Sequence, residues 1–249
     1  MTDVAALERA CLTALPALRQ GFDGSFVLKA FLGGTGRANS CCSLDPAPDP
    51  DLAARIARIE ATYHRLGLTS RFRSTPLDPP GLAAALVARG YAIDKDDTIV
   101  HAGPIAAIAL ADPAVRDESG PTEAWMALVA TAEYQTPARR AEKLRNPELL
   151  AARGAWLVLR QDGIDAACLF AVADGPYCGI FDLATRPEFR RRGLGARLIR
   201  AAADWAGRLS AEILYAQVAA SNRASCALQA SLGLREAYRY RYYTKPTVP

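Results

Sequence analysis

The sequence predicts an α/β fold with a mixed sheet, built as two related domains in tandem. In the second half, three consecutive apolar runs are separated by tight turns, which is typical of antiparallel strands. The hydrophobic period then lengthens to that of an amphipathic helix. The first half repeats the helix and strand pattern in the same order, which indicates a degenerate internal duplication.

The three apolar runs predict strands over residues 155–160, 166–173 and 179–185. Gln161-Asp162-Gly163 separates the first two runs, and Asp174-Gly175-Pro176 separates the second two. Asp-Gly pairs favour the two-residue turns of β-hairpins. We therefore expect the three strands to be neighbours in an antiparallel sheet.

A helix is expected to begin at the glycines of Gly193-Leu194-Gly195. Its apolar side chains recur at helical spacing at Leu194, Leu198, Ala201 and Trp205. The other elements expected in this half are helices near 123–133 and 138–150, a strand over 213–218, a helix opened by Ser221 or Asn222 and ended by Gly233, and an aromatic strand over 238–243. Helices on the faces of a mixed sheet follow from this order.

The first half carries the same pattern in weaker form. Leu52, Ile56, Ile59 and Tyr63 have the same spacing as the later helix stripe, each 142 positions before its counterpart. A short strand near 71–74 and a leucine-rich segment with Gly90 follow. We therefore predict a degenerate domain over residues 1–108 and a second domain over 109–249. Two unrelated αβ segments are the alternative, because amphipathic stripes coincide easily.

Composition excludes several classes of protein. The chain of 249 residues is 51% hydrophobic and carries a formal net charge of +4, which is typical of a globular protein and modest for a nucleic-acid binder. Only two histidines are present, and the six cysteines show no CxxC spacing. We therefore expect buried reduced thiols and no metal site. The N-terminus lacks a signal pattern, and no apolar run is long enough for a membrane span. We expect a cytoplasmic protein.

The turn before the helix at Leu194 is a candidate phosphate site. In Arg190-Arg191-Arg192-Gly193-Leu194-Gly195, glycines at a strand-to-helix junction allow successive backbone amides to face one concavity. A Walker loop would need Lys where Ala196 stands, and a dinucleotide fingerprint would need Gly where Leu198 stands. A pyrophosphate held by amides and arginines fits this turn.

Residues from about 150 to 245 resemble the GCN5-related N-acetyltransferases (GNAT). Arg190, Gly193 and Gly195 fill the family's Q/R-x-x-G-x-G/A hallmark, and Asn222 opens the next helix. The further matches are Ser225, Leu228 and Leu232-Gly233-Leu234. The first half resembles the same fold without the hallmark, because Asp49 and Asp51 stand where a pyrophosphate would need amides and positive charge.

The resemblance implies acetyl-coenzyme A (acetyl-CoA) as co-substrate and no metal. The pyrophosphate would be held by Arg190, Arg191, Arg192, Gly193, Leu194, Gly195 and Ala196. The backbone of Leu183, Ala184 and Thr185 would pair with the pantetheine amides, and Asn222 and Ser225 would line the thioester end. The first half is not expected to bind coenzyme A.

The expected reaction is direct attack of a primary amine on the acetyl thioester. Asp182, a lone carboxylate in an apolar strand, is the candidate base, and pairing with an arginine or capping a turn is the alternative. Gln229 stands where many family members have a tyrosine that protonates the leaving thiolate, and an amide cannot give up a proton. A non-catalytic module that binds acyl-CoA is therefore the alternative function.

The acceptor is expected to be a small-molecule or peptide amine. We expect neither nucleic acid nor membrane as a partner, and a homodimer is a possible assembly. Residues 35–40 are either part of an acceptor pocket between the halves or a plain hairpin turn. Trp125, Tyr134 and Trp156 are candidates for the lining of the acceptor cleft, although Trp156 within a strand is better explained as core.

Overall fold

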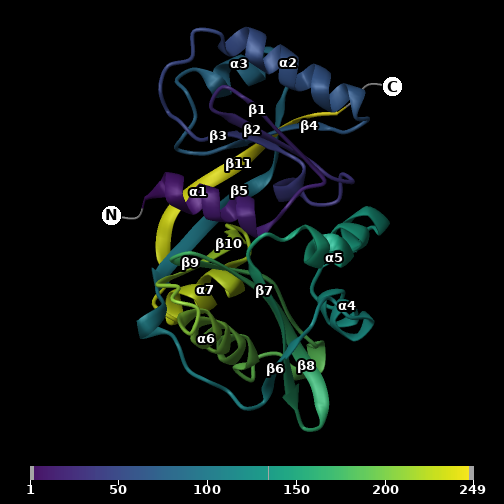
Figure 1. The fold of residues 1–249 in the computed structure, drawn as a ribbon, viewed down its shortest axis with the longest axis vertical. Helices are drawn as coiled ribbons and strands as arrows, with labels where there is room; N and C mark the ends of the chain where they lie inside the picture. The colour runs from purple at the N-terminus through teal and green to yellow at the C-terminus, as the bar shows by residue number, and fades with distance from the viewer. Residues whose placement is uncertain (1–2, 134, 247–249) are drawn as a thin grey trace.

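The computed structural model describes residues 3–133 and 135–246, and within them eleven strands form one mixed sheet (Figure 1). Their order is β1-β2-β3-β4-β11-β5-β10-β9-β8-β7-β6. The sheet carries helices on its faces, as the sequence predicts. No helix in these two ranges is long and apolar enough to cross a membrane.

The first half contains five strands and three α-helices among the described residues. In chain order these are α1 (Val4–Ala14), β1 (Arg19–Asp23), β2 (Phe26–Ala30), β3 (Cys41–Ser43), α2 (Leu52–Arg65), β4 (Ser70–Ser74), α3 (Leu82–Ala88) and β5 (Ala92–Pro104). Short 3-10 turns at Gly36–Ala38 and Ile105–Ala107 interrupt the connections. The β-β-β-α-β-α-β order is present here behind the additional helix α1.

The second half repeats that order after a short strand and two helices. Its elements are β6 (Val115–Glu118), α4 (Glu123–Val129), α5 (Pro137–Leu149), β7 (Arg153–Gln161), β8 (Ile164–Asp174), β9 (Tyr177–Thr185), α6 (Leu194–Gly207), β10 (Ile213–Ala219), α7 (Arg223–Ser231) and β11 (Arg235–Lys245). A 3-10 turn at Pro187–Phe189 precedes α6. The predicted helix over 123–133 is shorter than expected, because α4 ends at Val129.

The predicted hairpin between β7 and β8 is confirmed. Gln161 pairs with Ile164, and both central residues have positive φ, 53° at Asp162 and 79° at Gly163. This is the backbone of a two-residue turn that matches the twist of the flanking strands.

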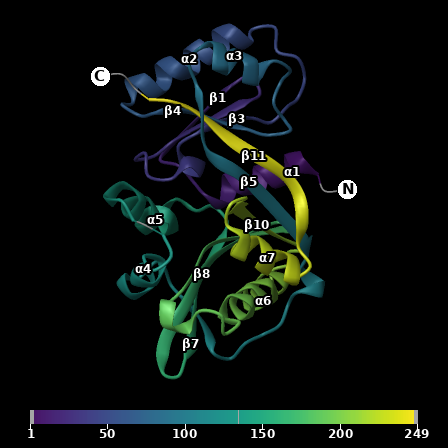
Figure 2. The same ribbon diagram turned by 180° about the vertical axis from the view of Figure 1, so that it is seen from behind.

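The last strand of each half lies beside a strand of the other half (Figure 2). β5 pairs antiparallel with β10, β11 pairs antiparallel with β4, and β5 and β11 pair with each other. The corresponding strands of the two halves are β1 and β7, β2 and β8, β3 and β9, β4 and β10, and β5 and β11. If each strand between β1 and β7 in the sheet is exchanged for its counterpart, the strand order is the same read from the opposite end. The two halves share a single hydrogen-bonded sheet.

Apolar packing covers both faces of the second half. On one face, α6 buries Leu194, Leu198 and Ile199 against β7, β8 and β9. Burial of a leucine or isoleucine side chain stabilises the fold by about 1.5–3 kcal/mol. On the other face, α1 and α4 cover β8 and β9 with Leu7 and Trp125. Of the six cysteines, five are buried free thiols and Cys226 is half-buried.

Helix α1 connects the two halves through a buried charged network. Glu8 is fully buried, and it accepts hydrogen bonds from Arg73 on β4 and from the hydroxyl of Tyr238 on β11. Close to this network, buried Lys29 donates to the carbonyls of Leu12, at 2.9 Å, and Leu15 at the end of α1. Burial, assisted by the positive charge of Arg73, lowers the pKa of Lys29 to about 7.

We predict that Lys29 makes stability depend on pH. Its pKa is lower in the folded protein than in the unfolded chain, so the unfolded chain binds more protons above pH 7, and stability should rise with pH by at most about 1.4 kcal/mol per pH unit. Denaturant unfolding between pH 7 and 8.5 measures this slope. The Lys29→Met variant should flatten it, and an unchanged slope would contradict the assignment.

Candidate active site

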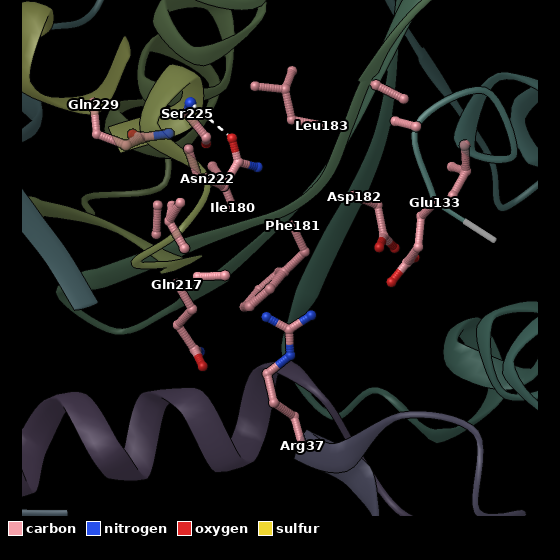
Figure 3. A pocket seen from close by; sticks show the side chains of 16 residues that line it. Arg37, Glu133, Ile180, Phe181, Asp182, Leu183, Gln217, Asn222, Ser225 and Gln229 are labelled. Atoms are coloured by element: carbon pink, nitrogen blue, oxygen red, sulfur yellow. Dashed lines mark hydrogen bonds between the residues drawn. The ribbon is translucent and has the colours of Figure 1, made fainter. Parts of the chain in front are cut away.

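A pocket opens where β9 and β10 separate (Figure 3). The parallel ladder between these strands runs only from the Ile213 and Tyr177 pair to the Ala216 and Ile180 pair. Beyond it the pocket encloses about 290 Å³. Its lining includes Arg37, Val129, Ala132, Glu133, Ile180, Phe181, Asp182, Leu183, Ala184, Gln217, Asn222, Ser225 and Gln229.

A β-bulge shapes the wall formed by β9. The register with β8 shifts so that Asp182 and Leu183 together face the single residue Leu169. Asp182 has φ 54°, which is uncommon for a residue other than glycine and is tolerated best by Asn and Asp. Thus Asp182, Leu183 and Ala184 all line the pocket, and Thr185 ends the strand beyond it.

The predicted phosphate turn leads directly into α6. Arg191 and Gly193 have φ values of 63° and 78°, so the chain turns sharply before the helix. The amide of Arg190 donates to the carbonyl of Pro187 at 3.2 Å, whereas the amides from Arg191 to Ala196 meet no acceptor among the described residues. Unpaired amides at a helix N-terminus form an anion site.

The three arginine side chains of this turn behave differently. Arg190 donates to the carbonyls of Thr185, at 3.1 Å, and Thr131, at 2.8 Å, so it braces the turn. Arg192 lies over the ring of Phe189 and 3.8 Å from Asp162. Arg191 is exposed. The side chains of Arg191 and Arg192 belong to this turn and can attract an anion to it.

Helix α7 supplies three of the predicted residues. Asn222 is the N-cap, and its side chain accepts a hydrogen bond from the Ser225 amide at 3.1 Å. Gln229 is only 2% exposed, and its Oε1 has no hydrogen-bond partner among the described residues. Gly195 of α6 leaves room for this helix, since a Cβ there would lie 3.2 Å from the Leu228 side chain.

Asp182 forms a buried ion pair with a cation that the sequence did not indicate. Lys143 of α5 donates to Asp182 Oδ1, and both side chains are under 10% exposed. Lys143 also lies 3.5 Å from Glu133, the carboxylate on the same side of the pocket. Asp182 Oδ2 has no hydrogen-bond partner in the part of the chain that the structure describes. The alternative role, ion pairing, is thus present, with lysine in place of arginine.

The first half contributes Arg37 to the pocket. The segment 31–40 connects the antiparallel strands β2 and β3, and its 3-10 turn carries Arg37 to the ring of Phe181, 5.6 Å from the centroid. In Figure 3 its guanidinium lies on the side of Phe181 opposite Asn222 and Ser225. The segment therefore joins two strands and also reaches the pocket.

Buried Glu142 of α5 holds this segment in place. Its carboxylate accepts bonds from the amides of Leu32, Gly34 and Thr35, at 3.0, 2.8 and 2.7 Å, and from the side chains of Thr35 and Asn39. Gly34 is required at this contact, because a Cβ there would lie 2.5 Å from a backbone atom of α5. Helix α5 thus positions both Lys143 and, through the segment, Arg37.

Several aromatic residues are assigned by the structure to the core. Trp125 and Trp156 are buried, and Trp156 stacks on Phe170, so neither lines the pocket; Tyr134 lies outside the described residues. Among the tyrosines of β10 and β11, Tyr240 and Tyr242 line a second chamber beside the pocket. Sequence reasoning missed Glu142 and Lys143, because a polar helix carries no sign of which face is buried. It also missed Glu133, which lies between α4 and α5.

The corresponding turn of the first half differs in its chemistry. Before α2, the prolines at positions 46, 48 and 50 lack amide hydrogens, and the amides of Ala47 and Asp51 donate to carboxylates, each at 3.0 Å. Asp49 also pairs with Arg55 at 2.5 Å. This turn therefore offers a phosphate fewer free amides than the glycine turn does, and its aspartate carboxylates would repel the anion.

Comparisons with known proteins agree with this architecture. A family model described as "Probable histone acetyltransferase Rv0428c C-terminal" matches residues 1–243. "Uncharacterized N-acetyltransferase YobR" of Bacillus subtilis is 25% identical over 98% of this chain and 100% of its own length. A solved GCN5-related N-acetyltransferase from Kribbella flavida has a TM-score of 0.72 and 19% identity, covering 99% of this chain and 96% of its own.

A tandem GNAT protein from the clavulanic acid biosynthesis pathway also shares the fold. Its TM-score is 0.57 at 14% identity, over 79% of this chain and 70% of its own. The fold and the pocket define a GCN5-related N-acetyltransferase. The chain belongs to the family whose model it matches over residues 1–243, and it is an enzyme of the N-acetyltransferase class.

We predict that Glu142→Leu loosens the segment 31–40. Five hydrogen bonds would be lost and several buried donors left unpaired, so stability should fall by about 3 kcal/mol or more. Hydrogen exchange at Leu32, Gly34 and Thr35 should accelerate. Glu148→Leu, on an exposed position of the same helix, is the control. Equal exchange in the two variants would contradict the assignment.

Proposed function

We propose that the protein transfers the acetyl group of acetyl-CoA to a primary amine. The observation that carries the proposal is the separation of β9 and β10 next to the unpaired amides of residues 191–196. An extended pantetheine chain would lie along the free edge of β9 at Leu183, Ala184 and Thr185. The amides before and within the first turn of α6 would bind the pyrophosphate. Asn222 and Ser225 would line the thioester end.

The amine would enter from the other side of the pocket. Asp182 and Glu133 would attract an ammonium group there, and Asp182 Oδ2 would accept its proton. The neutral amine would then attack the thioester carbonyl, so that a C–N bond forms and the C–S bond breaks. The products are the acetamide and the coenzyme A thiol, with release of one proton overall. A backbone amide near Leu183 or Ala184 would stabilise the oxyanion.

Gln229 would act on the leaving thiolate by hydrogen bonding alone. Its carboxamide is buried at the pocket wall on the α7 side, where Asn222 and Ser225 also lie. An amide can donate a hydrogen bond to sulfur but cannot transfer a proton. Since a thiol with a pKa near 8.5 leaves readily as thiolate, general acid catalysis is not essential.

We predict one acetyl-CoA per chain in a calorimetric titration. Gly193→Glu should weaken binding by about 100-fold or more, because a carboxylate would stand beside the pyrophosphate amides. Gly193→Ala is the matched control, since it introduces the same strain at φ 78° without charge, and a Cβ there meets open space. Two molecules per chain would contradict a first half that does not bind coenzyme A. Absence of binding would overturn the proposal.

We predict that Asp182→Asn lowers kcat/KM for the amine by about 100-fold, while the affinity for acetyl-CoA stays within about twofold. The substitution also leaves Lys143 buried without its ion pair, which is costly. The double variant Asp182→Asn, Lys143→Met removes that cost. If the double variant recovers wild-type turnover, Asp182 is only a partner of Lys143. Glu133→Gln should lower kcat/KM less than Asp182→Asn does. A larger loss in Glu133→Gln than in Asp182→Asn would make Glu133 the base.

A further inference from the structure

Arg37 is a cation in the pocket without a protein anion. Its guanidinium forms no hydrogen bond or ion pair with any residue that the structure describes, and it lies over the face of Phe181. Burial opposes the charge, but Tyr240, Tyr242, Asp182 and Glu133 outweigh burial and raise the pKa of Arg37. A charged guanidinium with five donors is therefore held at the pocket, where it can bind a ligand.

The neighbouring carboxylates already have cations of their own. Asp182 is bonded to Lys143, and Glu133 lies 2.6 Å from Arg139. These pairs leave Arg37 as the surplus charge facing the acceptor side. Burying a charge is costly unless it is paired, so a partner is expected when the site is filled.

The position of Arg37 separates it from the phosphate site. Figure 3 shows its side chain across Phe181 from Asn222 and Ser225, the residues nearest the N-terminal end of α7. The phosphates of the donor would lie at α6, beyond Leu183. An anion on Arg37 would thus belong to the acceptor.

A second chamber of about 330 Å³ continues from Arg37. It shares Arg37, Glu133, Gln217 and Ala219 with the main pocket, and polar side chains line it. The Arg71 Nε and the Tyr242 hydroxyl are buried there without a hydrogen-bond partner among the described residues. Asp94 is the chamber's other carboxylate. This chamber can accept the polar remainder of a small molecule.

We propose that the acceptor is a free amino acid, whose carboxylate is bound by Arg37 and whose ammonium group faces Asp182 and Glu133. A planar guanidinium binds a carboxylate through two parallel hydrogen bonds, which fixes the amine next to it. The side chain of the amino acid would occupy the chamber beside Tyr242. A lysine side chain within a polypeptide carries no carboxylate close to its amine. The inference rests on the acetyl transfer proposed above and specifies its substrate class.

The test uses thiol release from acetyl-CoA with the twenty standard amino acids, each compared with its own carboxamide. We expect at least one amino acid to be acetylated, with kcat/KM about 100-fold above that of its carboxamide. In Arg37→Met this ratio should collapse toward 1, and in Arg37→Lys, which keeps a point charge, it should be intermediate. Arg208→Met, on an exposed arginine at the end of α6, should retain the wild-type ratio.

Thermal melts of each variant, together with calorimetric binding of acetyl-CoA, establish that it is folded. The inference is overturned if no amino acid is acetylated, if the ratio is near 1 in the wild type, or if Arg37→Met leaves it unchanged. It is also overturned if a lysine peptide with blocked ends is acetylated faster than every amino acid. That last outcome would leave the proposed acetyl transfer intact. By contrast, failure of the wild type to bind acetyl-CoA would defeat both proposals.

Discussion

The backbone hydrogen bonds of β5 with both β10 and β11 hold the two halves in one sheet. Because each half places its last strand beside a strand of the other, the halves cannot rotate against each other without breaking these ladders. The same pairing fixes β10 on one side of the pocket while β8 fixes β9 on the other. The gap between β9 and β10 is thus set by strands on both sides, which would let the proposed donor and acceptor meet in a defined geometry.

Helix α5 positions the residues on the proposed acceptor side of the pocket. The carboxylate of Glu142 accepts hydrogen bonds from backbone amides of the segment 31–40, which have no partner in regular secondary structure. Lys143 forms an ion pair with Asp182 on β9. One helix therefore fixes the base candidate and the guanidinium of Arg37 relative to each other. These buried charges add little to the stability of the fold, because desolvation offsets most of their attraction. They do require a defined geometry, because a buried charge that loses its partner is costly.

The two halves have the same order of elements but different chemistry at the turn before the first crossover helix. In the second half the amides of residues 191–196 are unpaired, whereas in the first half the prolines lack amide hydrogens and aspartate carboxylates accept from the amides of Ala47 and Asp51. The first half supplies instead the segment that carries Arg37 and a strand that pairs with β10. In the proposed reaction, the second half would hold the donor and both halves would contribute residues to the acceptor side.

The sequence by itself determined the local features: the strand and helix order of the second half, the hairpin at Asp162-Gly163, and the glycine turn at Gly193. These depend on hydrophobic period and on backbone conformations that few residues adopt, which are properties of neighbouring residues. Only the tertiary structure decided that β5 and β11 lie side by side, that Lys143 pairs with Asp182, and that Arg37 reaches the pocket. Those contacts join residues far apart in the chain, and their geometry is fixed by packing and strand pairing, which leave no periodic signal in the sequence.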